Sequence, residues 1–131
     1  MTTFELIWLA ALAGGGIALL AILAAKREVG SAAIAAILCA AFSAFTAIQI
    51  AQEGVTGFFT NHSQSLTGLQ VWWDLLMCAL IALFLIAPRA RRQGMNVTLW
   101  GLFIGTTASI GLLAMCARLF WLERQSDTRA A

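Results

Sequence analysis

Four long apolar segments, separated by short polar stretches, constrain what this chain can fold into. They run from about residue 4 to 25, 31 to 51, 66 to 87 and 96 to 122. Each reaches the ~20 residues that a helix needs to cross ~30 Å of hydrocarbon. The sequence therefore predicts an all-α fold: one domain over residues 1–131 that forms an integral membrane four-helix transmembrane bundle.

The charge content supports a membrane setting and excludes nucleic acid as a partner. Only 11% of the residues are charged, whereas soluble domains carry about 25%. The net charge is only +2, and the basic residues stand in short clusters between apolar segments instead of forming a phosphate-binding face. The lipid bilayer is therefore the expected partner.

The basic residues in the turns predict an orientation. Lys26 and Arg27 follow the first segment, and Arg89, Arg91 and Arg92 follow the third. Because cytoplasmic loops are enriched in Lys and Arg, we expect both turns inside and both chain termini on the outer side. The three arginines act as a cytoplasmic anchor in one interpretation; in another they bind anionic lipid or an acidic partner.

Small residues at four-residue spacing predict where helices pack. Gly14 lies in such a stripe on the first segment, and Gly101, Gly105 and Ser109 form one on the fourth. Helices in lipid associate by close backbone approach, which small residues allow. These stripes predict helix contacts, either within one chain or between copies.

One carboxylate, Asp74, interrupts the head of the third segment. An unpaired charge within a membrane is costly, so we expect a partner or access to water. If the last two segments form an antiparallel hairpin, Arg118 reaches toward Asp74 and pins the two helices together. The competing hypothesis is a ligand or ion site at the outer end, formed by His62, Gln49, Glu53, Gln70, Asp74 and Arg118.

No pattern in the sequence indicates catalysis, a metal site or a bound cofactor. Bis-histidine haem ligation needs two histidines, and the chain has one. Cys39, Cys78 and Cys116 stand in three separate apolar segments and form no CxxC pair. We therefore expect a protein that is not an enzyme.

Several features lie between residues 66 and 124: Asp74, Gly94-Met95 after the arginine-rich turn, GTTASIGLL in the fourth segment, Arg118 and Leu122-Glu123-Arg124. With these features, residues 66–124 resemble a family of small four-helix bacterial membrane proteins of unknown function. The resemblance implies a multi-pass protein of the bacterial inner membrane and no chemistry.

These observations lead to two functional expectations. The first is an accessory or assembly subunit of a membrane complex, in contact with other membrane subunits or with copies of itself. The alternative is a binder or carrier of a small lipophilic or cationic ligand around Asp74.

Overall fold

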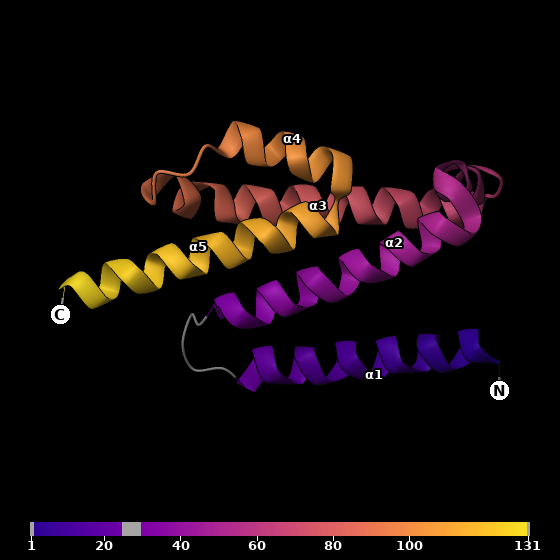
Figure 1. Cartoon of the computed structure of the whole chain (residues 1–131), viewed down its shortest axis with the longest axis horizontal. Coiled ribbons are helices and arrows are strands. Elements are labelled where there is room, and N and C mark those ends of the chain that lie inside the picture. The colour runs from indigo at the N-terminus through magenta and orange to yellow at the C-terminus, as the bar shows by residue number, and fades with distance from the viewer. Residues whose placement is uncertain (1, 25–29, 131) are drawn as a thin grey trace.

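The protein is all-helical in its computed structural model (Figure 1). The structure describes residues 2–24 and 30–130, the side chains of residues 4, 58, 59, 61, 62 and 130 excepted. Over these residues the helices are α1 (Thr3–Ala24), α2 (Ala32–Ser63), α3 (Leu66–Arg92), α4 (Val97–Thr107) and α5 (Ser109–Ala130). The all-α prediction is confirmed, and the predicted count of four helices is wrong because the fourth apolar segment is divided into α4 and α5.

Three of these helices are long and apolar enough to cross a membrane. The qualifying stretches are Glu5–Ala24, Ala32–Gly57 and Leu66–Arg92. By contrast, α4 has 11 residues, a rise of only ~16 Å against the ~30 Å of a hydrocarbon core. Three crossing helices support a membrane protein, and α4 by itself reaches about half-way.

Polar caps fix where three helices begin. The Ser31 hydroxyl accepts from the Ile34 N–H at 3.3 Å, and the Ser65 hydroxyl accepts from the Gly68 N–H at 3.0 Å. Asn96 Oδ1 accepts from the Thr98 and Leu99 N–H groups of α4 at 3.1 and 3.2 Å. Each cap satisfies donors that the first helical turn leaves free, so these starts agree with the expected starts at residues 31, 66 and 96.

Gly94, and not Pro88, ends α3. The helix continues through Pro88 to Arg92, although the third segment was expected to end at residue 87. Gly94 has φ 71°, and the N–H groups of Gly94 and Met95 donate to the Arg91 and Ala90 carbonyls, both at 3.0 Å. This is the Schellman arrangement, which needs a left-handed residue and so favours glycine.

The fourth apolar segment reverses direction at Ala108. Ala108 has φ 47° and ψ −113°, a backbone conformation that ends the helical path. Its N–H donates to the Ile104 carbonyl at 2.6 Å, and the Thr107 hydroxyl donates to the Phe103 carbonyl at 2.7 Å. The Ala108 bond satisfies a carbonyl that the end of α4 leaves free, and the Thr107 bond pairs that hydroxyl within its own helix; both matter because lipid offers polar groups no partner.

The reversal folds α5 back between α2 and α3. As Figure 1 shows, α5 runs in the same direction as α3 and opposite to α2. The core lies where α3, α4 and α5 meet, and its buried members are Ala90, Met95, Ile104, Met115 and Leu119. Gly111 permits this approach, because a Cβ there would stand 2.9 Å from the Ile104 Cα on α4.

The two ends of the chain lie at opposite ends of the bundle (Figure 1). Four complete crossings would have placed both ends on one side, as expected from the sequence. Because the fourth segment turns back at Ala108, the end of α5 lies beside the end of α3 (Figure 1).

Candidate functional site

The structure does not bring Asp74 and Arg118 together. Arg118 lies five residues before Glu123, which bonds Arg89 at the far end of α3. Asp74 precedes Arg89 by fifteen residues on α3, a rise of ~22 Å. The ion pair expected from an antiparallel hairpin is therefore absent among the described residues, because α5 runs parallel to α3.

The other predicted polar residues remain at the opposite end of the bundle. Gln49 and Glu53 lie on α2, whereas Gln70 and Asp74 lie on α3 beyond the turn that joins these helices. Gln49 is half-buried and the other three are exposed. None of the four forms a side-chain hydrogen bond or ion pair to another described residue. His62 belongs to α2, and its side chain lies outside the described residues.

Arg89 joins the end of α3 to α5. Its Nε and Nη2 donate to the two carboxylate oxygens of Glu123 at 2.9 and 2.7 Å. The guanidinium also stands 5.6 Å from the centre of the Phe120 ring. A two-pronged ion pair with an aromatic contact fixes the guanidinium in place, so Arg89 packs α3 against α5.

Arg118 stacks on a neighbouring aromatic ring of its own helix. Its guanidinium lies 5.1 Å from the centre of the Trp121 ring, within the range of a cation–π contact. Both side chains are exposed. Tryptophan and arginine that reach toward the headgroups are typical of the membrane interface.

The arginines in the described part of the chain lie mostly at one end of the bundle. Arg89, Arg91 and Arg92 end α3, Arg124 and Arg129 lie in the last part of α5, and Arg118 lies at the middle of α5. Two described carboxylates, Glu123 and Asp127, accompany them, whereas Glu5, Glu53 and Asp74 lie toward the other end. Lys26 and Arg27 lie outside the described residues. The fold thus separates charge along its length more strongly than the four-span topology predicts.

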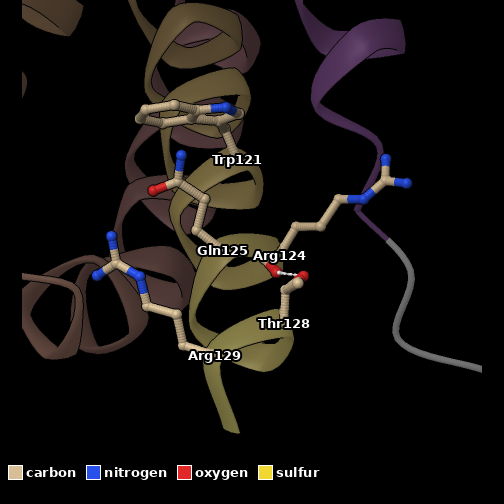
Figure 2. A pocket seen from close by; sticks show the side chains of 5 residues that line it. All are labelled: Trp121, Arg124, Gln125, Thr128 and Arg129. Atoms are coloured by element: carbon tan, nitrogen blue, oxygen red, sulfur yellow. Dashed lines mark hydrogen bonds between the residues drawn. The ribbon is translucent and has the colours of Figure 1, made fainter. Parts of the chain in front are cut away.

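Near the end of α5, five side chains line a shallow depression of about 410 Å³. Figure 2 shows Trp121, Gln125 and Arg129 following one another along the helix, with Arg124 extending toward the start of α2. The Thr128 hydroxyl donates to the Arg124 carbonyl at 2.9 Å. No carboxylate is among these five lining residues.

Sequence reasoning did not select this depression. Its residues follow the apolar part of the fourth segment, and a straight span would have carried them away from the arginine-rich turn. The signal present in the sequence is a group of guanidinium and amide side chains directly after an interfacial tryptophan, which is typical of a headgroup contact.

The small residues predicted to pack between helices differ in how close their neighbours lie. A Cβ at Gly101 would meet the Leu83 side chain at 3.8 Å, whereas Gly14 and Gly105 face open space within 4 Å. Ser109 begins α5 directly after the reversal and is half-buried. Gly111 on α5, which is not among these predicted residues, lies close to α4, since a Cβ there would stand 2.9 Å from the Ile104 Cα.

Comparison with known proteins supplies no relative for this chain. No protein-family model, no curated protein and no solved structure matches it. The resemblance carried by residues 66–124 therefore stays a prediction, and any function has to be argued from the chain's own residues.

Proposed function

We propose that this protein is a non-enzymatic subunit of a membrane complex, with an accessory or assembly role, in the bacterial inner membrane. The observation that carries the proposal is the isolation of α1. Among the described residues, no Cα of α1 lies within 8 Å of a Cα in another helix. A helix that belongs to the chain and is not held by the chain's other helices is free to pack against another protein.

The sequence of α1 supports a role in packing. Three consecutive glycines, Gly14 to Gly16, stand at its centre, and each has nothing within 4 Å of where a Cβ would be. Glycine lowers helix stability by about 1 kcal/mol per residue relative to alanine. Small residues are typical of surfaces where a second transmembrane helix approaches closely. The occupant that fits α1 is a partner's membrane helix, from another subunit or from a second copy of this chain.

Charge supports an orientation for this subunit. The arginine-rich end of α3 and α5 suits the cytoplasmic side, because Lys and Arg are retained there. The N-terminal end of α1 then faces outward and the C-terminal end of α5 faces the cytoplasm. The other helices would present apolar sides to lipid, and α1 would present to the partner the face that carries Gly14.

Native mass spectrometry of the protein, extracted gently from its own host membrane, tests the proposal. Wild type is expected to leave the membrane with further polypeptide mass, and Gly14→Leu is expected to lose that mass because the side chain blocks close approach. Gly16→Leu is the matched control, since position 16 points about 160° away around the helix. A wild-type protein recovered as a bare monomer, or two variants that retain the partner equally, would contradict the proposal.

A second function, binding of a cationic or lipophilic ligand, rests on Asp74. Its carboxylate is exposed on an apolar helix and makes no ion pair with another described residue. An ionisable group in such a position is a candidate ligand site. Extraction of one or two chains with a small bound adduct, and loss of that adduct in Asp74→Asn without loss of the fold, would favour this function over the subunit role.

A further inference from the structure

The polar side chains in the membrane-spanning part of α2 lie along one side of that helix. Between residues 32 and 51 they are Cys39, Ser43, Thr46 and Gln49, which fall within an arc of about 120° at 3.6 residues per turn. All four are half-buried, and we call them the α2 stripe. Glu53, which is exposed, continues the same arc toward the turn that joins α2 to α3.

The α2 stripe begins opposite the point where the fourth apolar segment reverses. The Cys39 thiol donates to the Ile110 carbonyl at 3.5 Å, two residues after Ala108. The rest of the stripe lies beyond this contact, and Gln49, ten residues farther along α2, is ~15 Å away by helical rise. Because α4 ends and α5 begins at the reversal, neither helix extends alongside this part of α2 (Figure 1).

Several polar groups in this region have no hydrogen-bond partner among the described residues. The Ser43 hydroxyl and the Gln49 amide form no such bond. At the reversal, the N–H groups of residues 109–111 and the carbonyls of residues 105–107 likewise find no partner in the described backbone. No side-chain polar atom in this part of the chain is both unpaired and fully buried, so the Ser43 and Gln49 atoms keep surface that a small molecule can touch.

These unpaired groups lie deep in the membrane. From its start after Asn96, α4 has 11 residues and rises ~16 Å before the reversal, about half of the ~30 Å hydrocarbon core. Polar side chains without hydrogen bonds are strongly unfavourable in hydrocarbon, and irregular backbone at this depth occurs where it lines water or is buried in protein. Water supplies donors and acceptors alike, whereas an acyl chain or an apolar partner helix supplies neither.

We propose that water enters this protein along the α2 stripe, from the turn between α2 and α3 as far as the reversal at Ala108. Glu53 lies at the mouth of this inlet, Ser43 and Gln49 bind water along it, and the free backbone groups of the reversal bind water at its inner end. Beyond Cys39 the stripe gives way to Ala35, which is only 6% exposed, so the inlet ends there. The inference is independent of the subunit role, which rests on α1, and of ligand binding at Asp74.

Thiol labelling of the full-length chain in nanodiscs, where both membrane faces are open to reagent, tests the inlet. In a cysteine-free background, Ser43→Cys and Gln49→Cys are compared with Ala44→Cys and Ile48→Cys, which lie one residue away in depth on the exposed apolar side of α2. A charged methanethiosulfonate reagent reacts with thiolates, which form in contact with water. The two stripe variants are expected to react about tenfold or more faster than their controls, as measured by intact mass spectrometry.

Two labelling results would overturn the proposal. The first is an equal rate at the stripe and control positions in nanodiscs, after labelling in denaturant has shown the four thiols to be equally reactive. The second is reaction of the stripe variants with a neutral, lipid-soluble maleimide but not with the charged reagent, which would show that acyl chains or a protein cover the stripe.

Hydrogen exchange of the wild type supplies a measurement that needs no substitution. The amides of residues 109–111, which no described carbonyl protects, are expected to exchange in nanodiscs well before the amides of residues 115–117 in the same helix. Equal protection of the two groups would show that water does not reach the reversal and would also overturn the proposal.

Discussion

The ion pair between Arg89 and Glu123 offers a direct test of the chain reversal at Ala108. The two groups meet through hydrogen bonds of 2.9 and 2.7 Å only because α5 returns alongside α3. If residues 96–123 formed one straight helix, Glu123 would lie ~40 Å from the turn that follows Arg89. The pair then could not form, and the two side chains would be energetically independent.

The expected magnitude follows from the geometry of the pair. The side chains are 32% and 27% exposed, so solvent screens much of their attraction. Because the contact is two-pronged, we place the pair at about 1 kcal/mol, the upper end of the range measured for ion pairs on protein surfaces. Arg89 also contacts the Phe120 ring at 5.6 Å, which adds about 1 kcal/mol. We therefore expect Glu123→Ala to lower the free energy of unfolding by about 1 kcal/mol and Arg89→Ala by about 2 kcal/mol.

A double-mutant cycle measures the coupling between them. The double variant is expected to lose about 2 kcal/mol, which is about 1 kcal/mol less than the sum of the single losses. Unfolding of the full chain in mild detergent, driven by added dodecyl sulfate and followed by circular dichroism, supplies the free energies. Arg91, which is exposed and forms no ion pair with a described residue, replaces Arg89 in the control cycle and should show no coupling to Glu123. Additivity of Arg89→Ala and Glu123→Ala within about 0.3 kcal/mol would refute the reversed path of α5.

Three further predictions concern the same hairpin. Gly111→Ala is expected to lower the free energy of unfolding by about 1–3 kcal/mol, because the added Cβ has no room against α4. Gly105→Ala, where the Cβ would meet open space, is expected to leave the free energy of unfolding unchanged or slightly higher in the same titration. Equal losses in the two variants would contradict the close packing at Gly111. Ala108→Gly is expected to raise stability by about 1 kcal/mol, since glycine adopts φ 47° without strain, and a loss there would argue against the turn. In a cysteine-free background, Thr128→Cys and Gln93→Cys are expected to react with an impermeant maleimide from the same membrane side, and labelling from opposite sides would refute the topology.

Two turn residues show why the start of the fourth segment was predictable and the reversal inside it was not. Asn96 begins α4 as the sequence indicates, because a cap acts on N–H groups two and three residues away and its effect is local. Ala108 carries no comparable signal, since alanine is a strong helix former and GTTASIGLL reads as uninterrupted helix. Its positive φ is stabilised by contacts made elsewhere, namely the packing of Met115 and Leu119 against Ile104 and Ala90.

The amino-acid sequence by itself determined the helical class, the membrane-length segments and the starts of α2, α3 and α4, because hydropathy and capping depend on neighbouring residues along the chain. Tertiary structure alone decided the direction of α5. That direction separates Asp74 from Arg118, joins Arg89 to Glu123 across 34 positions of sequence and places Arg124 and Arg129 at the same end of the bundle as Arg91 and Arg92. The physical reason is that a charge selects its partner by position in space, and one reversal at Ala108 changes the position of every residue that follows it.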